Sequence, residues 1–178
     1  MYAVNQYDAV AESYDSLFKD KASIEENRKI ASMLFEVSGI FLDVGCGTGL
    51  LLDILKVSPD EYWGIDPSSK MLDVFRKKHP EYNNLCIPFD LLNLKLATFN
   101  SIVALFGSAS YIDIEALTDI PEGKNIFLMF YKENYHPVTY KRTGCNLEHY
   151  SHSRSELEER FPHCEVREFD NYYIVTNV

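Results

Sequence analysis

A short apolar run that ends in closely spaced glycines restricts the fold of this chain more than any other part of its sequence. The run ends at Val44, and Gly45, Gly47 and Gly49 follow in the pattern G-x-G-x-G. Where a buried strand gives way to a helix, glycines permit a tight turn and let a ligand lie directly against the backbone. The pattern predicts a strand, a ligand-binding loop and a helix; a plain strand–turn–helix without a ligand is the alternative.

An acidic residue at the end of the next apolar run supplies a second anchor for the same ligand. Asp66 lies 21 residues after Gly45 and closes the run that begins at Tyr62. A carboxylate in this position accepts hydrogen bonds from both ribose hydroxyls of a nucleoside bound to a doubly wound sheet. A helix-capping acid before Ser68 is the alternative role, and the sequence leaves both open.

The spacing of the glycines separates two classes of nucleotide ligand. Dinucleotide sites use G-x-G-x-x-G and place a pyrophosphate at a helix N-terminus. This chain has G-x-G-x-G instead and carries Asp43 immediately before the loop. That carboxylate repels a pyrophosphate and suits a ligand with an ammonium group and a positive sulfur, so a nicotinamide oxidoreductase is disfavoured. No Walker-type G-K-[ST] follows the glycines, which disfavours an NTPase.

Short apolar runs alternate with helical stretches along the chain. Strands are predicted at residues 40–44, 62–65, 85–87, 102–106, 126–130, 165–169 and 172–176. The S-x-x-E sequences at Ser23 and Ser153 are capping boxes that begin two helices, and Gly39 can end the first. Ser68 caps another helix, which ends in the basic run 76–78, and residues 50–56 form a further one.

This alternation predicts the fold class. Strands separated by helices pair in parallel, with helices on both faces of the sheet. The last two strands form a hairpin with a turn near Asp170 and Asn171, which adds an antiparallel edge. We therefore expect one α/β domain, residues 1–178: a Rossmann-like, doubly wound, mostly parallel sheet with an antiparallel C-terminal strand in a three-layer α/β/α arrangement.

Charge and cysteine usage narrow the functional classes. With 17 Lys and Arg against 27 Asp and Glu, the net charge of −10 disfavours nucleic acid and anionic lipid as partners. The four cysteines are far apart, so neither a zinc nor a redox motif is indicated, and no metal is expected. The acidic N-terminus is unlike a signal segment, and no apolar run approaches the ~18 residues of a membrane span, so we expect a cytoplasmic protein. The sequence does not indicate the oligomeric state.

The loop and the following strand resemble the class I S-adenosylmethionine-dependent methyltransferases. Residues 43–49, Asp-Val-Gly-Cys-Gly-Thr-Gly, are similar to the first motif of that family, and residues 64–68, Gly-Ile-Asp-Pro-Ser, to its second-strand motif. Residues 7–15 resemble the N-terminal segment common in the small-molecule branch. Residues 99–103 resemble the pattern of the fourth strand, with Asn100 in place of the usual Asp.

The resemblance implies a set of cofactor-binding residues. They are Tyr14, Asp43, Gly45, Cys46, Gly47, Asp66, Pro67, Met71, Asp90 and Phe106. Gly45 and Gly47 would border the methionine portion, and the Phe106 carbonyl would lie near its amine. Tyr14 would lie over the cofactor from an N-terminal helical lid, residues 1–38. A nucleophilic role for Cys46 is disfavoured because no base is paired with it.

On the nucleoside side, the resemblance implies that Asp66 holds the ribose. Met71 and the backbone at Pro67 would cover the adenine, and Asp90 would approach its amino group. Met71 has an alternative role as an ordinary core residue, because a methionine at helical spacing usually is one.

The implied activity is methyl transfer from S-adenosylmethionine to a small-molecule acceptor by in-line displacement. Residues 131–152 are rich in tyrosine and histidine and follow a strand, so we expect a substrate-facing flap; an aromatic loop packed on the sheet is the alternative. No catalytic residue is assigned: only a hydroxyl acceptor benefits from a base, and His149 and His152 are the candidates. A binder of the cofactor or its demethylated product without transferase activity, as a sensor or regulatory subunit, is the alternative function.

Overall fold

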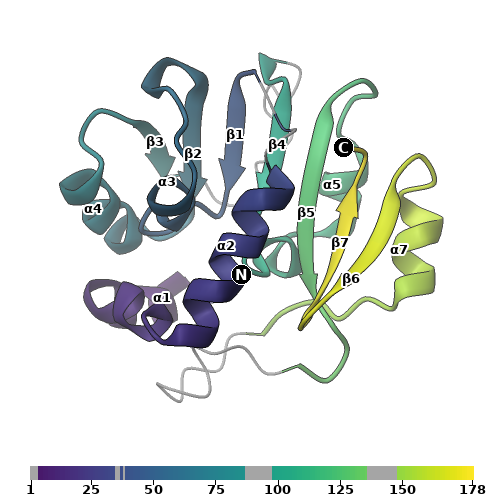
Figure 1. Ribbon diagram of the computed structural model, residues 1–178, viewed down its shortest axis with the longest axis horizontal. Coiled ribbons are helices and arrows are strands. Elements are labelled where there is room, and N and C mark those ends of the chain that lie inside the picture. Colours follow the sequence, from purple (N-terminus) through teal and green to yellow (C-terminus); the bar gives the residue numbers. More distant parts are fainter. Residues whose placement is uncertain (1–3, 35–36, 38, 87–97, 136–147) are drawn as a thin grey trace.

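Seven strands form one sheet in the order β3-β2-β1-β4-β5-β7-β6 in the computed structural model (Figure 1), which describes residues 4–34, 37, 39–86, 98–135 and 148–178. The strands are β1 (Phe41–Val44), β2 (Tyr62–Asp66), β3 (Asn83–Cys86), β4 (Ser101–Ala104), β5 (Asn125–Tyr131), β6 (Glu165–Phe169) and β7 (Tyr172–Thr176). The first five pair in parallel, and β7 pairs antiparallel with both β5 and β6. The predicted mostly parallel α/β sheet with an antiparallel C-terminal end is therefore confirmed.

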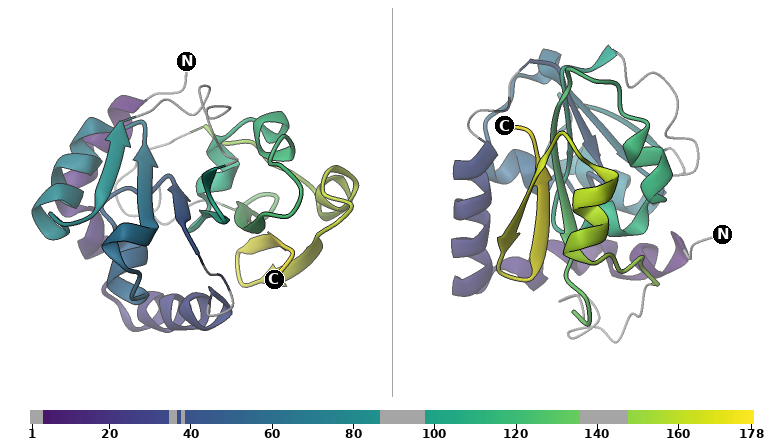
Figure 2. Two further views of the ribbon diagram at one scale, coloured as in Figure 1. Left: turned by 90° about the horizontal axis from the view of Figure 1, so that it is seen from above. Right: turned by 90° about the vertical axis from the view of Figure 1, so that its right-hand side faces the viewer.

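Helices cover both faces of this sheet, as the views in Figure 2 show. The longer ones are α1 (Val4–Val10), η1 (Ala11–Phe18), α2 (Lys21–Met33), α4 (Ser69–Lys78) and α7 (Arg154–Arg160). The short ones are α3 (Leu50–Ile54), η3 (Pro59–Glu61), η6 (Ser108–Tyr111) and α5 (Ile114–Thr118). Side chains of α2, α3 and α4 share one core with the sheet, and side chains of α5 and α7 share the other.

The two cores follow from the period-2 alternation of side chains along a strand. In β4, Ile102 packs with the α5 and α7 side, whereas the next residue, Val103, packs with the α2 and α3 side. Both are fully buried. Because successive residues of the fully buried strands β1 and β4 face opposite helical layers, their continuous apolar runs are those of a sheet covered on both faces.

Helix caps agree with the sequence prediction in two places and correct it in a third. Ser68 accepts a hydrogen bond from the amide of Met71 at 3.1 Å, and Ser153 accepts one from Glu156 at 3.2 Å. The capping box predicted at Ser23 is wrong: α2 begins earlier because Asp20 accepts from the amides of Ala22 and Ser23. An aspartate at N-cap satisfies the free amides of the first turn as well as a serine does.

The predicted end of that first helix also differs. Gly39 has the left-handed φ of +80°, yet α2 already ends at Met33, and Gly39 belongs to the turn before β1. There Asn100 accepts a hydrogen bond from the amide of Ile40 at 3.0 Å. The departure of Asn100 from the usual aspartate is thus accommodated by a structural contact.

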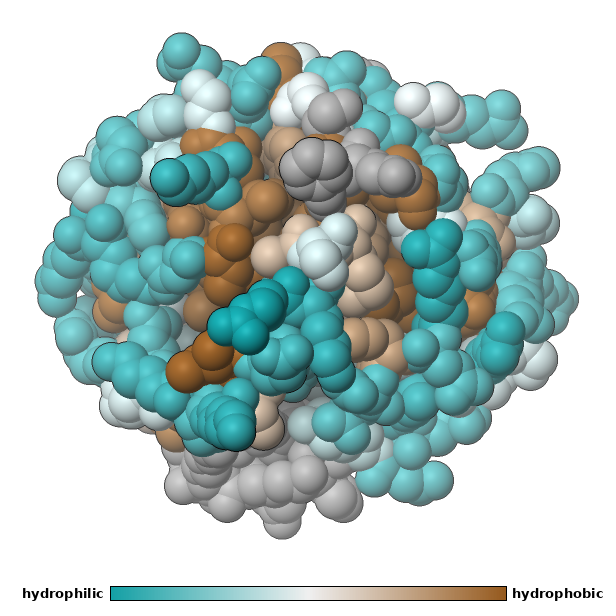
Figure 3. All heavy atoms as spheres, in the orientation of Figure 1, coloured by the Kyte–Doolittle hydropathy of each residue, from teal (hydrophilic) through white to brown (hydrophobic). Residues whose placement is uncertain are grey.

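On the face shown in Figure 3, hydrophilic residues surround areas where hydrophobic side chains reach the surface. Within the described part of the chain, the large hydrophobic residues that are clearly exposed are Ile24, Ile40 and Leu85. None of the described helices has the length and apolar character that a membrane span requires.

Candidate functional site

The glycine loop leaves β1 and is held against the end of β2. The amides of Gly45 and Cys46 both donate to the carbonyl oxygen of Ile65, at 2.8 and 3.0 Å. The φ values of Gly45, Gly47 and Gly49 are +77°, +52° and +87°. Residues with side chains rarely adopt these angles, so the three glycines are required by the path of the backbone.

Asp66 joins this loop to the start of α4. One carboxylate oxygen accepts from the amide of Gly47 at 2.9 Å, and the other accepts from the amide of Ser68 at 2.8 Å. The helix cap itself is Ser68, so the bond from its amide fixes the turn before α4, and the bond from Gly47 places the carboxylate at the glycine loop. Burial raises the pKa of Asp66 to about 6, although the two amide bonds oppose that rise. Each oxygen keeps a second lone pair with which to accept a hydroxyl.

Asp43 lies beneath the loop and has a partner that the sequence did not reveal. Its carboxylate accepts from the Tyr62 hydroxyl at 2.8 Å, and both side chains are buried. Burial raises the pKa of Asp43 to about 7, while the Tyr62 bond lowers it and the charge of Asp66 raises it further. Burial likewise raises the pKa of the Cys46 thiol, which keeps it protonated and argues against a nucleophilic role.

Met71 packs against the glycine loop. It is buried, and its methyl carbon lies 3.2 Å from the place that a Cβ on Gly47 would occupy. The carbonyl of Pro67, before the same helix, accepts a long contact from the Cys86 thiol at 3.6 Å. Asp90, predicted to approach the adenine, falls outside the described residues.

The turn after β4 brings Phe106 to the same edge of the sheet. Phe106 has a φ of +53°, an unusual value for a residue with a side chain, and Gly107 follows at +83°. Such backbone costs about 1–3 kcal/mol and is found most often at functional sites. The Tyr131 hydroxyl donates to the Phe106 carbonyl at 2.9 Å, and the Ser108 hydroxyl donates to the carbonyl of Gly45 at 3.3 Å.

Tyrosines from three elements gather beside this turn. The Tyr14 ring centroid is 5.9 Å from that of Tyr7, and the Tyr7 hydroxyl contacts the Tyr111 hydroxyl at 3.4 Å. Burial, followed by the charges of Tyr111 and Asp66, raises the pKa of Tyr14, so its hydroxyl is neutral. Asp8 of the same segment accepts a hydrogen bond from the Ser68 hydroxyl, so the segment lies beside the start of α4; that it covers a cofactor stays a prediction.

The two candidate bases lie in different surroundings. The His149 ring is 5.3 Å from Tyr131 and 6.0 Å from Tyr111. His152 is 5% exposed and packs against Phe130, which points to the opposite face of β5 from Tyr131. His149 is therefore the candidate near the site. Of the predicted flap, residues 136–147 fall outside the described residues.

The sequence did not reveal how several residues of this site pair, because their partners are distant along the chain. They are Asp8, Asp15, Thr48, Tyr62 and Tyr131. Their identities carried no signal of pairing, apart from the resemblance of residues 7–15 to a family segment. In the described residues, no cluster of His, Cys, Asp and Glu has the arrangement of a metal site.

Fold and site together define the class of the protein: an α/β Rossmann-like methyltransferase fold with a glycine loop and an acid at the end of the second strand. Residues 41–121 match the family model described as a methyltransferase domain. The matched segment includes the glycine loop and Asp66. The whole chain shares the fold of solved S-adenosylmethionine-dependent methyltransferases.

Solved structures of the same fold cover nearly the whole chain. The DhpI–SAM–HEP complex has a TM-score of 0.67 at 15% identity, over 97% of this chain and 94% of that one. SAM-bound CalS10 from Micromonospora echinaspora, an amino pentose methyltransferase, has a TM-score of 0.65 at 14% identity, over 95% and 97% of the two chains. A S-adenosylmethionine-dependent methyltransferase from Clostridium acetobutylicum has a TM-score of 0.61 at 16% identity, over 96% and 97%. At these identities the likeness is one of fold.

A curated relative matches part of the chain. The uncharacterized protein MJ1252 of Methanocaldococcus jannaschii is 28% identical over 109 residues, which are 61% of this chain and 41% of that protein. The chain thus matches about two fifths of the length of this relative.

Proposed function

We propose that this chain binds S-adenosylmethionine along the glycine loop and transfers its methyl group to a small-molecule acceptor by in-line displacement. The observation that carries the proposal is the position of Asp66. Its buried carboxylate bonds to the amide of Gly47 in the loop and has lone pairs left for a ribose. The solved relatives named with bound S-adenosylmethionine share this fold.

The proposed contacts divide along the cofactor. Asp66 accepts the ribose hydroxyls, and Met71, already packed on Gly47, covers the adenine. At the other end, the Phe106 carbonyl accepts a hydrogen bond from the methionine ammonium, and the buried carboxylate of Asp43 favours the positive charge nearby. Tyr14 covers the cofactor from the N-terminal segment.

When bound, the cofactor supplies a methyl group on a sulfonium, which is an excellent leaving group. The protein's part is to hold the nucleophilic atom of the acceptor in line with that methyl, at ~3–3.5 Å, and to exclude water. An amine or thiol that loses its proton early needs no base. For a hydroxyl acceptor, His149 beside Tyr131 is the candidate to take the proton.

A small acceptor agrees with two features of the chain. Its net charge of −10 opposes the approach of nucleic acid phosphates. The tyrosines beside Phe106, together with His149, offer ring faces for packing against a small organic molecule. The amino pentose methyltransferase CalS10, which shares the fold, is named for such an acceptor.

The proposal is tested by titrating the protein with S-adenosylmethionine and with S-adenosylhomocysteine in a calorimeter. Substituting Asp66→Ala removes charge-assisted hydrogen bonds worth ~1.5–3 kcal/mol each, so the dissociation constant should rise at least about tenfold. Asp60→Asn, an exposed acid in η3, is the matched control and should bind as the unmodified chain does. Unchanged affinity in Asp66→Ala would refute the ribose assignment.

A second measurement separates a transferase from a binder. The protein is incubated with methyl-labelled cofactor and a small-metabolite extract, and the fractions are assayed for label. A transferase labels at least one fraction, whereas a sensor or regulatory subunit binds the cofactor and labels none.

A further inference from the structure

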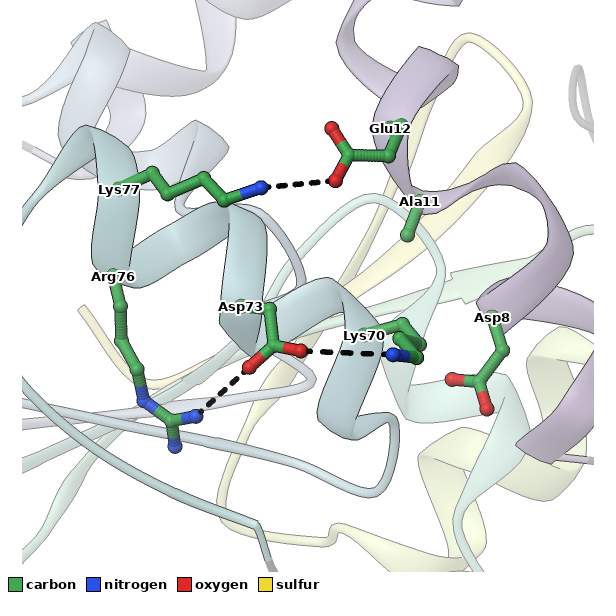
Figure 4. Close-up of a pocket in the computed structure, with 7 residues that line it drawn as sticks. All are labelled: Asp8, Ala11, Glu12, Lys70, Asp73, Arg76 and Lys77. Carbon is green, nitrogen blue, oxygen red and sulfur yellow. Dashed lines mark hydrogen bonds and ion pairs between the residues drawn. The ribbon is translucent and has the colours of Figure 1, made fainter.

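Acidic residues hold the N-terminal segment to the cofactor side of the molecule. Asp8, Glu12 and Asp15 are spaced so that they lie on one side of a helical segment. Asp8 accepts a hydrogen bond from the Ser68 hydroxyl, and Glu12 pairs with Lys77 of α4 at 3.0 Å. Figure 4 shows this region: a pocket of about 340 Å³ between the segment and α4, with the Glu12–Lys77 pair on one side.

Asp15 makes the most central of these contacts. One carboxylate oxygen accepts from the hydroxyl of Thr48, and the other accepts from the ammonium of Lys78 at 2.6 Å. Lys78 also pairs with Asp53 of α3 at 2.8 Å. A single carboxylate therefore connects η1 to the glycine loop, to the end of α4 and, through Lys78, to α3.

The contact to Thr48 is a contact to the cofactor-binding loop itself. Thr48 is 1% exposed and stands between Gly47 and Gly49, which both adopt left-handed φ angles. Because glycine has no Cβ, sterics restrain the backbone on either side of Thr48 only weakly. Hydrogen bonds must then hold this part of the loop in place. Asp66 holds the amide of Gly47, and Asp15 holds the side chain of the next residue.

The Asp15–Lys78 pair is better shielded from water than the Glu12–Lys77 pair. The side chains of Lys78 and Asp15 are 26% and 29% exposed, against 67% and 79% for Lys77 and Glu12. Partial burial opposes the charge of Lys78, but the bonds to Asp15 and Asp53 outweigh it and raise the pKa of Lys78. Solvent screens the outer pair far more than the inner one, so the inner pair carries most of the coupling.

We propose that Asp15 is a positioning residue for cofactor binding: it couples docking of the N-terminal segment to the conformation of the glycine loop. With Asp15 fixed on Thr48, the 3₁₀ geometry of η1 directs the neighbouring Tyr14 toward Tyr7, whose ring in turn contacts Tyr111. The loop conformation that receives the cofactor and the docked segment that covers it then form together. This inference rests on the proposed binding of the cofactor at that loop.

The test is a calorimetric titration of the full chain with S-adenosylhomocysteine. Asp15→Asn removes the charge that pairs with Lys78 and weakens the bond from Thr48, whereas Thr48→Val removes that bond. Each should raise the dissociation constant about tenfold, which corresponds to ~1.4 kcal/mol. Thr48→Ser keeps the hydroxyl and should bind more tightly than Thr48→Val. The double variant should lose less affinity than the two single effects combined, because both single variants weaken the bond between Asp15 and Thr48. Glu12→Gln is the matched control: an acid of the same segment, whose exposed pair should contribute little.

Hydrogen exchange supplies a readout that a general loss of stability would not reproduce. In the unmodified chain, S-adenosylhomocysteine should slow exchange at residues 4–18. In Asp15→Asn at saturating ligand, that protection should be lost while the amides of β1 and β4 keep theirs.

The outcomes distinguish the two proposals. Absence of any binding by the unmodified chain would overturn the proposed function and this inference with it. Tight binding by the unmodified chain with unchanged affinity in Asp15→Asn and Thr48→Val would overturn this inference alone. A Glu12→Gln variant that binds as weakly as Asp15→Asn would also overturn it, because the loss of affinity would then follow from removing any negative charge from the N-terminal segment.

Discussion

The buried carboxylate of Asp43 should make the stability of the ligand-free protein fall as pH rises. Its pKa is about 7 in the folded chain, against an ordinary value of 3.8, and burial is the main cause. Between these values the folded chain holds a proton that the unfolded chain has lost. The contribution of this group to the free energy of unfolding is therefore fully present below pH ~4 and is lost as pH rises through about 7.

The size of the effect follows from the two pKa values. A change from 3.8 to about 7 corresponds to about 4 kcal/mol, at ~1.36 kcal/mol for each pH unit. Asp43→Asn keeps an oxygen that can accept the Tyr62 hydroxyl and removes the titration. Relative to the unmodified protein, this variant should become more stable with rising pH, by up to about 4 kcal/mol at pH 8.

Urea unfolding of both proteins at pH 5, 6, 7 and 8 measures this difference, because titrating groups that do not interact with Asp43 cancel when the two are compared. The exposed Asp60→Asn serves as the control and should give a curve parallel to that of the unmodified chain. If Asp43→Asn also gives a parallel curve, the carboxylate is not desolvated as the structure indicates, and the reasoning fails.

Two further predictions concern the scaffold of the site. Gly107→Ala should destabilise the protein by at least about 2 kcal/mol in urea unfolding. The added Cβ would lie 2.1 Å from the Tyr131 ring, and the backbone there has a φ of +83°, which alanine rarely adopts. An unchanged free energy of unfolding would show that this turn relaxes freely. Ser68→Ala should cost about 1 kcal/mol through loss of the α4 cap, with Ser68→Thr retaining most of the stability. If thermal unfolding shows the alanine and threonine variants to be equally stable, the cap makes no contribution.

Local sequence signals were sufficient for much of the fold. β6 and β7 occupy the predicted residues 165–169 and 172–176, and Asp170 in their turn has a φ of +45°. The Ser68 and Ser153 caps lie where the sequence placed them. Each of these signals involves residues a few positions apart, so no knowledge of the sheet order was needed.

The shorter elements were predicted only in part, because their local pattern is weak. The five-residue α5 was not predicted, and η1, which lies in the predicted helical region 1–38, is a 3₁₀ helix that contacts α4 and α1. The first residue of α2 was misplaced because the S-x-x-E sequence at Ser23 fits a capping box, whereas Asp20, three positions earlier, is the N-cap. In the structure the Ser23 hydroxyl donates to Asp20 instead of capping a helix itself.

The sequence by itself determined the α/β class, the glycine loop and the placing of Asp66 at the end of the second strand, because these depend on glycine conformations and on apolar periodicity. Only the tertiary structure decided which groups face these residues. Asp43 accepts a hydrogen bond from Tyr62, 19 positions away in the chain, and Asp15 accepts one from Thr48, 33 positions away. Such pairs depend on strand order, register and helix docking, and a residue's type and its spacing from its neighbours specify none of these.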